Sequence, residues 1–305
     1  MTVVATVVHY AGREATSACL ASLLAGTVVP ETIAVIDNQG DVDPAVEAGW
    51  RASLAAGAGT ILEVLRPGAN LGYAGAGAEG ARRALEVGAD WFWLVNNDVE
   101  VQRTCLAELL HAGECHPRAG LLSPLILERT GDVWFAGGTV NWRTLKVHHE
   151  TRAPTDDEAT PTGFATGCAV LASTAMVREC GLPDASLFMY LEDVEWTWRQ
   201  ARGGWTALLV PRAVARHDVA RRGRRRVFSP AAVYYMTRNR LVLGGRLGHR
   251  WTAAAGALAW AARQTAKGPR VRMTGRLALA TVAGAADGLR GRTGPMTPGL
   301  QSRLT

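Results

Sequence analysis

The chain has 305 residues, of which 48% are hydrophobic and 20% charged, a composition that excludes a disordered tail, a collagen-like repeat and a small disulfide scaffold. Its five cysteines are odd in number and include no Cys-x-x-Cys pair, so they suggest neither a disulfide framework nor a zinc site and fit reduced thiols in the cytoplasm. The net charge is +6, and the length predicts one large domain or two small ones.

The first hundred residues alternate between β-branched runs and Ala-rich amphipathic stretches, which is typical of βαβ units in a mostly parallel sheet. The run MTVVATVVHY has no basic region ahead of its apolar residues, so it predicts a first strand and not a signal peptide. The predicted strands are Val3–His9, Thr32–Asp37, Thr60–Leu65 and Trp91–Asn96, and the predicted helices are Glu14–Ala25, Pro44–Ala56 and Gly75–Val87.

The pattern becomes less regular after Asp98. We expect shorter strands at Gly120–Pro124, Asp132–Val140, Thr162–Leu171 and Trp205–Val210, with a helix at Val194–Arg202. Three further helices are predicted at Ala231–Leu247, Trp251–Ala266 and Arg272–Leu289. The uncharged apolar stretches in this last part are shorter than the roughly 18–20 residues that a transmembrane helix needs, so no membrane span is expected.

The charge is unevenly distributed along the chain. Residues 1–218 carry 16 Lys and Arg against 26 Asp and Glu, whereas residues 219–305 carry 17 Lys and Arg against the single acid Asp287. Such a basic segment indicates contact with phosphates, nucleic acid or an anionic membrane. Five of its arginines lie within Arg221–Arg226, where they could bind phosphates or simply form a solvated loop.

Each predicted strand of the first half ends in polar residues, among them Asp37, Arg66 and the run Asn96–Asp98. In open α/β sheets ligands bind outside the carboxyl ends of the strands, so these ends are the candidate site. The run Asn96–Asp98 has two interpretations that the residues alone do not separate. Asp98 could bind Mg²⁺ together with a diphosphate, or the three residues could form an ordinary turn.

A G-x-G-x-x-G pattern, Gly75–Gly80, suggests a dinucleotide site and hence an NAD(P)-dependent oxidoreductase. That motif requires its first glycine in the turn directly after a strand, but the segment from Arg66 to Gly75 separates it from the strand that ends at Leu65. Close packing of a helix against the sheet is therefore the favoured interpretation, and the oxidoreductase is kept as the alternative.

Three acids, Glu192, Asp193 and Glu195, begin a predicted helix. Acids are favourable at a helix N-terminus, which explains part of the cluster without any function. Neighbouring carboxylates also raise one another's pKa, which suits one of them to act as a general base. Further along, His217 could be a metal ligand or an ordinary histidine.

Taken together, these residues resemble the family 2 glycosyltransferases with a GT-A fold, in particular their rhamnosyl- and galactofuranosyltransferase-like branch. The resemblance runs from Val3 to about Arg240 and is densest in four segments, Val35–Asn38, Asn70–Gly75, Leu94–Asp98 and Thr166–Arg199. It implies an α/β GT-A fold, a mixed sheet flanked by helices, over residues 1–228. Within it a donor half would cover about 1–100 and an acceptor half about 101–228, and residues 229–305 would form a basic helical extension.

The resemblance also implies an inverting transfer of a sugar, rhamnose or another hexose, from a UDP- or dTDP-sugar to an acceptor hydroxyl, with Asp193 as the general base. Asp98 and His217 would bind Mg²⁺ or Mn²⁺, because Asn96 stands where the family carries its first metal-binding acid. The residues implied at the nucleotide sugar are Tyr10, Asp37, Arg66, Asn70, Gly72, Asn97 and Asp98. Those implied on the acceptor side are Gly167, Tyr190, Glu192 and Trp196.

The expected acceptor is a polysaccharide, a lipid-linked glycan or a small natural product. The basic helices are expected to contact the inner face of a membrane or a second copy of the chain, which leaves the protein cytoplasmic or peripheral. A nucleic-acid partner is not expected. A non-enzymatic basic scaffold ranks last among the alternatives, because it leaves Glu192, Asp193 and His217 without a role.

Overall fold

The computed structural model describes residues 1–305 except 55–58, 219–227, 268–272 and 305. Its first hundred residues form the predicted alternation of strands and helices. In order, they are β1 (Val3–His9), α1 (Arg13–Leu24), β2 (Thr32–Asp37), α2 (Pro44–Leu54), β3 (Ile61–Leu65), α3 (Gly72–Glu86) and β4 (Trp91–Asn96). The predicted strands of this part are confirmed to within a residue.

The remaining elements mix strands and helices up to residue 217, and the described elements beyond it are helical. They are β5 (Val99–Val101), α4 (Cys105–Cys115), β6 (Ala119–Glu128), β7 (Val133–Phe135), β8 (Gly138–Asn141), β9 (Lys146–His149), β10 (Thr160–Pro161), β11 (Ala169–Ser173), α5 (Thr174–Cys180), η1 (Ala185–Leu187), α6 (Glu192–Arg202), β12 (Thr206–His217), α7 (Pro230–Arg246), α8 (Arg250–Lys267), α9 (Thr274–Leu289) and α10 (Pro298–Leu304).

One mixed sheet organises the molecule, with the order β10-β12-β6-β11-β4-β1-β2-β3. Strands β4, β1, β2 and β3 are parallel neighbours, in a register that places His9 beside Asp37 and Val8 beside Asn96. Strand β11 runs antiparallel between β4 and β6. The polar residues at the ends of β1, β2 and β4 therefore lie along one edge of the sheet.

Side chains alternate between the two faces of each strand, so every buried strand contributes to two cores. On one face Val3, Ala5 and Val7 pack with residues of α1, α2 and α4. On the other face Val4 and Val8 pack with α3, α5 and α6. Helices cover both faces, as the parallel part of such a sheet requires.

Four predicted strands differ from the structure. The expected strand Gly120–Pro124 is too short, because β6 continues to Glu128, and the expected strand Asp132–Val140 divides into β7 and β8, which belong to different sheets. The expected strand Thr162–Leu171 is wrong as a single element, because the chain pairs only at β10 and again from Ala169. The expected strand Trp205–Val210 is too short, because β12 continues to His217. Proline lacks the N–H that a strand donates, so Pro211 predicts a strand end; instead a register shift between Val210 and Val214 lets the strand continue.

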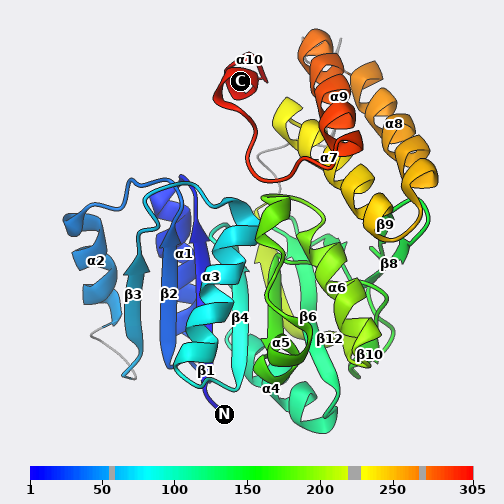
Figure 1. Ribbon diagram of the computed structural model, residues 1–305. Helices are drawn as coiled ribbons and strands as arrows, with labels where there is room; N and C mark the ends of the chain where they lie inside the picture. The colour runs from blue at the N-terminus through cyan, green and yellow to red at the C-terminus, as the bar shows by residue number, and fades with distance from the viewer. Residues whose placement is uncertain (55–58, 219–227, 268–272, 305) are drawn as a thin grey trace.

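The C-terminal helices lie above the edge at which β1–β4 end, as Figure 1 shows. Helix α7 begins at Ser229, whose side chain accepts a hydrogen bond from the Ala232 amide, and Pro230 occupies the first turn, an arrangement favoured at helix starts. Helices α7, α8 and α9 pack against one another. None of the helices in the described part of the chain combines the length and apolar character that crossing a bilayer requires.

Candidate active site

Three strands bring the predicted metal residues together at this edge. The Asn96 amide at the end of β4 donates to the Cys168 carbonyl, over 2.9 Å, directly before β11. His217 ends β12, and its Nε2 lies 3.2 Å from Oδ1 of Asp98. The two residues that are 119 positions apart in the sequence are thus direct neighbours.

The surroundings of His217 orient its ring. Trp134 of β7 contacts the imidazole edge-on, with ring centroids 5.0 Å apart, and the buried Nδ1 has no hydrogen-bond partner among the described residues. Burial alone would lower the pKa of His217, but Cys168 and the Asp98 carboxylate raise it to about 10. The protonated Nε2 therefore donates to the Asp98 carboxylate, and the pair can offer an imidazole nitrogen and a carboxylate oxygen to a cation once the cation displaces that proton.

The predicted base lies at the start of α6. Asp193 accepts hydrogen bonds from two backbone amides, Gly167 N–H over 3.1 Å and Val194 N–H over 2.8 Å. These bonds hold the carboxylate against the turn that precedes β11. Three acids lie in the first turn of this helix, where the charges of Asp193 and Glu195 interact favourably with the partial positive charge of the N-terminus.

Glu192 and Asp193 differ in their surroundings. Glu192 is buried, its Oε2 has no partner among the described residues, and burial together with the Asp193 charge raises its pKa well above the usual range. Burial also raises the pKa of Asp193, to about 6, while the two backbone amides limit the rise. Glu192 therefore holds its proton to higher pH, and Asp193 is the member of the pair that ionises more readily.

Tyr73 of α3 connects the two parts of the site, and the sequence analysis missed it. Its hydroxyl donates to the Gly167 carbonyl. Burial raises its pKa well above the ordinary value, and so do Cys168 and the charges of Glu192, Asp193 and Asp98. A side chain at Gly167 would lie 3.2 Å from Tyr73 and 3.6 Å from Asp193. The glycine therefore lets the ring and the carboxylate approach each other.

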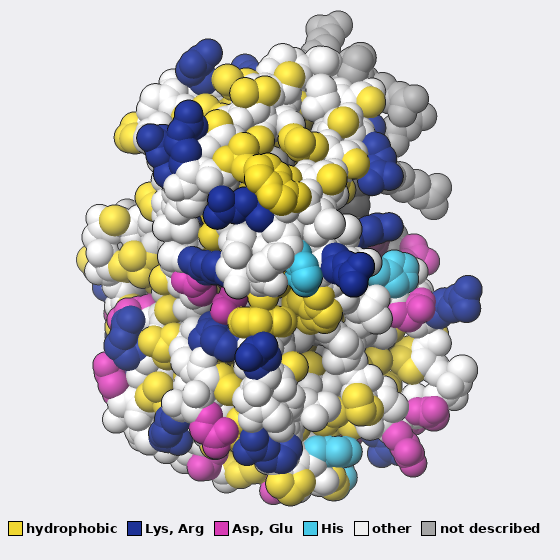
Figure 2. Space-filling model, turned by 45° about the vertical axis from the view of Figure 1, so that its right-hand side comes forward, with side chains coloured by type: hydrophobic (Ala, Val, Ile, Leu, Met, Phe, Trp, Pro, Cys, Tyr) yellow, Lys and Arg dark blue, Asp and Glu magenta, His cyan; other side chains and the backbone are white. Residues whose placement is uncertain are grey.

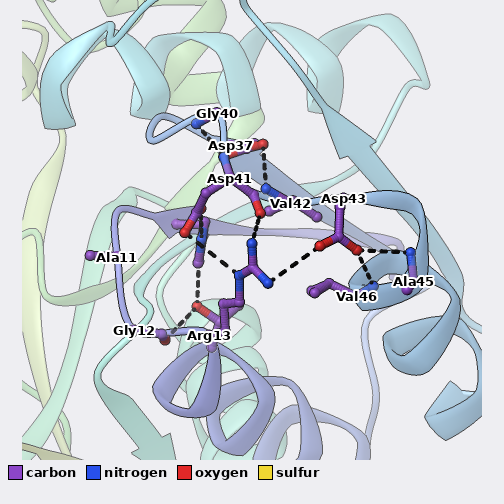
Figure 3. A network of polar contacts seen from close by, with 12 residues as sticks. Ala11, Gly12, Arg13, Asp37, Gly40, Asp41, Val42, Asp43, Ala45 and Val46 are labelled. Carbon is purple, nitrogen blue, oxygen red and sulfur yellow. Dashed lines mark hydrogen bonds and ion pairs between the residues drawn. The ribbon is translucent and has the colours of Figure 1, made fainter.

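A second polar cluster follows β1 and β2, shown in Figure 3. Asp37 is buried and accepts hydrogen bonds from the amides of Gly40, Asp41 and Val42, so it holds its own loop in shape. Arg13 lies between Asp41 and Asp43 and forms ion pairs with both. The predicted nucleotide residue Asp37 thus shapes the loop at the end of β2.

Potential metal ligands also gather in this second cluster. One atom each of His9, Asp37 and Asp41 lie within 4.8 Å of one another. His9 Nε2 lies 2.8 Å from Asp41 and Nδ1 lies 2.7 Å from Thr16 Oγ1. The polar end of β1 was noted in the sequence, but Asp41 was not. Because Asp37 is satisfied by amides and Asp41 by Arg13, the charges here are compensated without a cation.

The other predicted nucleotide residues lie around the same edge. Tyr10 is exposed after β1, and Arg66 pairs with Glu47 over 2.5 Å. Asn70 accepts the Gly72 amide over 2.8 Å, which makes it a capping side chain at the start of α3. Asn97 donates to the Ala11 carbonyl and to Thr16 Oγ1, each over 3.0 Å, and so ties the end of β4 to the start of α1.

Trp196 is corrected from the acceptor side to the core. Its side chain is 2% exposed, it packs against Phe92, and its Nε1 donates to the Gly181 carbonyl. Four residues beyond Glu192 it lies on the same face of α6, and its contact with Phe92 of β4 shows that this face turns to the sheet at Trp196. Tyr190 lies in the loop before α6, beside Glu192. The predicted arginine loop, Arg221–Arg226, lies outside the described residues.

The Gly75–Gly80 pattern lies inside α3, which begins at Gly72, and not in a strand-to-helix turn. A Cβ at Gly80 would lie 2.1 Å from Thr6 Oγ1 of β1. The glycines therefore bring helix and sheet close together, as the favoured interpretation states. A dinucleotide site is not supported.

Curated relatives of the chain are glycosyltransferases. The N-acetylglucosaminyl-diphospho-decaprenol L-rhamnosyltransferase of Mycobacterium tuberculosis is 29% identical over 227 residues, 66% of this chain and 71% of the relative. Galactofuranosyltransferase GlfT1 of the same organism is 33% identical over 212 residues, 66% of this chain and 65% of the relative. The chain thus spans just under two thirds of GlfT1. No protein-family model matches the chain.

Solved structures show the same fold. The mannosyltransferase PcManGT from Pyrobaculum calidifontis, in complex with GDP-Man and Mn²⁺, has a TM-score of 0.59 at 16% identity, covering 94% of this chain and 86% of its own. GalNAc-T7 with UDP, GalNAc and Mn²⁺ has a TM-score of 0.59 at 18% identity, covering 71% and 44%.

The solved structures give the chain a GT-A fold, a mixed sheet with its polar residues at one edge, and its curated relatives make it a glycosyltransferase. Within that class it resembles the rhamnosyltransferase- and galactofuranosyltransferase-like branch of family 2, through relatives 29% and 33% identical. The resemblance expected from the sequence is confirmed.

Proposed function

We propose that the protein is an inverting, metal-dependent glycosyltransferase that uses a UDP- or dTDP-sugar, with Asp193 as the general base. The observation that carries the proposal is the position of the Asp193 carboxylate. It is held by the amides of Gly167 and Val194, and Gly167 adjoins Cys168, which lies beside the pair Asp98–His217. The proposed base, whose pKa lies near neutral pH, and the candidate cation site thus meet at the adjacent residues Gly167 and Cys168.

Asp193 takes the proton of the acceptor hydroxyl as its oxygen attacks the anomeric carbon of the donor. The bond from that carbon to the diphosphate oxygen breaks on the opposite face, and the electron pair leaves with the nucleoside diphosphate. One displacement of this kind inverts the anomeric configuration. Glu192, whose pKa is raised by burial and by the Asp193 charge, opposes a second negative charge beside the base.

Asp98 and His217 would hold the cation, Mg²⁺ or Mn²⁺. Carboxylate and imidazole atoms 3.2 Å apart fit a shared cation, and the neighbouring buried Asn96 Oδ1 has no hydrogen-bond partner among the described residues. Such a donor set leaves positions open for phosphate oxygens. When bound, the cation offsets the charge that develops on the leaving diphosphate. Trp134 keeps the imidazole in the orientation this requires.

The nucleoside would lie over the ends of β1, β2 and β3. We assign it to the loop that Asp37 shapes, with Tyr10 exposed beside it and Arg66 at the end of β3. A carboxylate has about four lone-pair positions, so Asp37 can also accept the imide N–H of a uracil or thymine. Asn70 and Gly72 hold the start of α3 at the sugar side of this region.

For the transferred sugar we propose rhamnose or another hexose, because one relative is named for L-rhamnose and another for galactofuranose. The proposed acceptor is a hydroxyl of a polysaccharide or a lipid-linked glycan. Helices α8 and α9 expose apolar side chains, Trp251, Leu258, Val282 and Leu289, and Figure 2 shows hydrophobic side chains gathered with Lys and Arg on the upper part of the molecule. This surface suits peripheral contact with an anionic membrane that carries the acceptor.

The test is a donor panel. The protein is incubated with Mn²⁺ and with dTDP-rhamnose, UDP-galactofuranose, UDP-glucose or UDP-N-acetylglucosamine, each against several hydroxyl acceptors, and product configuration is read by NMR. We expect turnover with at least one donor and inversion at the anomeric carbon. Retention of the anomeric configuration would contradict the role of Asp193 as the base of a single displacement. Stabilisation of the protein by NAD(P), with none by the nucleotide sugars, would favour the alternative of an NAD(P)-dependent oxidoreductase.

A further inference from the structure

Two buried residues of α7 contact the loop that precedes the proposed base. Arg238 and Asn239 are each 0% exposed, which is unusual for side chains that carry so many hydrogen-bonding groups. Both project to the chain around Leu187–Tyr190, about fifty residues earlier. No role in substrate binding or catalysis has been assigned to either of them above.

The Asn239 amide group meets three backbone carbonyls at once. Its Nδ2 lies 3.0, 2.9 and 2.7 Å from the carbonyl oxygens of Leu187, Met189 and Tyr190, in that order. An NH₂ group has two hydrogens, so one of them is shared between two acceptors. The Oδ1 atom accepts from Arg238 Nε over 2.9 Å. Arg238 donates to the Oδ1 side of the amide, and the three carbonyls accept from its Nδ2 side. Only one orientation of the Asn239 amide therefore satisfies all four partners.

Arg238 adds further contacts with the same region. Its Nη2 donates to the Leu187 carbonyl over 2.8 Å, and its Nη1 donates to the carbonyl of Gly294. The Gly294 amide in turn donates to the Ser186 carbonyl over 2.6 Å. The guanidinium therefore fixes the Asn239 amide and joins the C-terminal segment to the loop.

The loop needs such support because its backbone is unfavourable. Phe188, Tyr190 and Leu191 have φ of 63°, 69° and 68°, in the left-handed region that residues with a Cβ avoid. Strained backbone persists where surrounding contacts over-determine it, and it clusters at functional sites. Leu191 is also the residue that caps α6, so this conformation decides where Glu192 and Asp193 begin the helix.

We propose that Asn239, oriented by Arg238, is a positioning residue for the transfer reaction: by holding the carbonyls of Leu187, Met189 and Tyr190 it sets the start of α6 and so places Asp193 against the acceptor. The inference rests on the proposed role of Asp193. The donor side of the site is formed by other elements, the ends of β1–β3 and the start of α3. Loss of the amide therefore affects turnover more than nucleotide binding.

The experiment compares Asn239→Ala with Asn239→Ser, which keeps one hydroxyl donor, and with Thr237→Val as the matched control. Thr237 is buried on the same helix, and its hydroxyl has no partner among the described residues. Turnover is measured with the donor selected by the panel, and binding of UDP and of dTDP, each with Mn²⁺, is measured by calorimetry. We expect kcat to fall roughly 10–100-fold in Asn239→Ala, the range that a misplaced catalytic group produces.

Asn239→Ser should recover part of this loss, and Thr237→Val should keep kcat within about 2-fold, the range of a substitution away from such features. Nucleotide affinity should change less than about 3-fold in all three, because the nucleoside is assigned to the ends of β1–β3 and the contacts that Asn239 loses lie in the loop before α6. The acidic limb of the pH profile of kcat should move in Asn239→Ala alone. Equal kcat in Asn239→Ala and Thr237→Val would overturn the proposal, and so would a parallel loss of kcat and nucleotide binding.

Hydrogen exchange gives a readout that needs no donor. The amide of Val194 is bonded to Asp193, and the amide of Ala74 is bonded to the Phe188 carbonyl. Both should exchange roughly 10-fold faster or more in Asn239→Ala and at the normal rate in Thr237→Val. Unchanged exchange rates of these two amides would overturn the positioning role of Asn239, even if no donor is turned over. Unfolding of both Asn239 variants beside a folded Thr237→Val would assign Asn239 to stability and overturn the positioning role.

Discussion

Adjacent carboxyl groups at the start of α6 ionise with different ease because their surroundings differ. Glu192 is buried without a partner for Oε2 among the described residues, whereas Asp193 has two backbone amides on its carboxylate. Hydrogen bonds to the charged form favour ionisation, and burial without them opposes it. When the surroundings push the pKa values of two carboxyl groups apart, one group is suited to act as an acid and the other as a base.

Asp193→Asn tests the base directly. The amide cannot accept a proton, so we expect turnover to fall roughly 10²–10⁴-fold, the usual contribution of general-base catalysis. Binding of UDP or dTDP with Mn²⁺ should persist, because those groups lie on the other side of the site. Initial rates and calorimetry measure the two effects. Near-normal turnover would remove Asp193 from the role and leave Glu192 and Glu195 as candidates.

The pH dependence follows from the same residue. The pKa of Asp193 is raised to about 6 in the folded protein, against about 3.9 for a free Asp. Turnover should therefore rise with pH through about 6 and level off above it. The sign for stability is opposite: between about pH 4 and 6 the folded state binds more protons than the unfolded state, so the free energy of unfolding should fall as pH rises. Denaturant titrations at several pH values measure this slope in the unmodified protein and in Asp193→Asn, and the difference between the two isolates Asp193 from the other acids; equal slopes in the two proteins would contradict the raised pKa.

The metal prediction concerns Asp98 and His217. His217→Ala and Asp98→Ala should each weaken binding of UDP or dTDP roughly 10-fold or more in Mn²⁺, since a lost ligand group typically costs at least this much affinity, and should have little effect in EDTA. His148→Ala, an exposed histidine of β9, serves as the control. If nucleotide affinity in the unmodified protein is equal with Mn²⁺ and with EDTA, the metal assignment is wrong.

At the scale of elements, the start of α3 is where the two halves of the site meet. Asn38 at the end of β2 donates to the Gly72 carbonyl over 2.9 Å and accepts from the Leu71 amide over 3.2 Å. The Ala74 amide donates to the Phe188 carbonyl over 3.0 Å. One helix end thereby connects the donor side to the loop before α6.

Gly72→Ala tests this junction. Gly72 has φ of +71°, and a Cβ there would lie 2.2 Å from the Phe188 carbonyl oxygen. The left-handed backbone alone costs about 1 kcal/mol for alanine, and relieving the contact with backbone should add roughly 1–3 kcal/mol, as overpacking does. Gly68→Ala is the matched control, because Gly68 has φ of +76° and no atom within 4 Å of an added Cβ. Chemical denaturation measures both, and equal losses of stability would show that the loop before α6 adjusts freely.

Element boundaries show which signals are local. The strand ends at His9, Asp37 and Asn96 were predicted because an apolar run stops at a polar residue, and the structure confirms them. The continuation of β12 past Pro211 was not predictable in this way, since it depends on pairing with β6 on the far side of a register shift. Trp196 was misplaced for a related reason: helical spacing alone does not say which face of α6 turns to the sheet.

The whole molecule places the basic C-terminal helices against the catalytic body. Phe188 stacks on Tyr235 with ring centroids 5.1 Å apart, and Asn239 bonds the same loop. Contacts that shape the site therefore cross the predicted boundary between the domain 1–228 and the helical extension 229–305. The faces of α8 and α9 turned away from the body keep Trp251 75% and Val282 68% exposed.

Membrane contact through these faces is tested with vesicles that contain an anionic phospholipid. The double variant Trp251→Ser, Val282→Ser should bind at least roughly 10-fold more weakly, because each large apolar side chain contributes on the order of 1.5–3 kcal/mol when buried. Binding should also fall as salt rises. Ile61→Ser, an apolar residue 58% exposed on β3, is the control. A dimer in solution with no vesicle binding would assign the faces to a second copy of the chain.

The sequence by itself determined the periodic part of this protein: the alternating strands and helices of the first hundred residues, the polar strand ends and the acids that open α6. These signals are local, because they depend on hydrophobic period and on the chemistry of neighbouring residues. Tertiary structure alone decided which residues meet. Tyr73, Trp134 and Asn239 contact groups about 50 to 94 positions away in the sequence, and such contacts follow from how helices and strands pack, which no local pattern encodes.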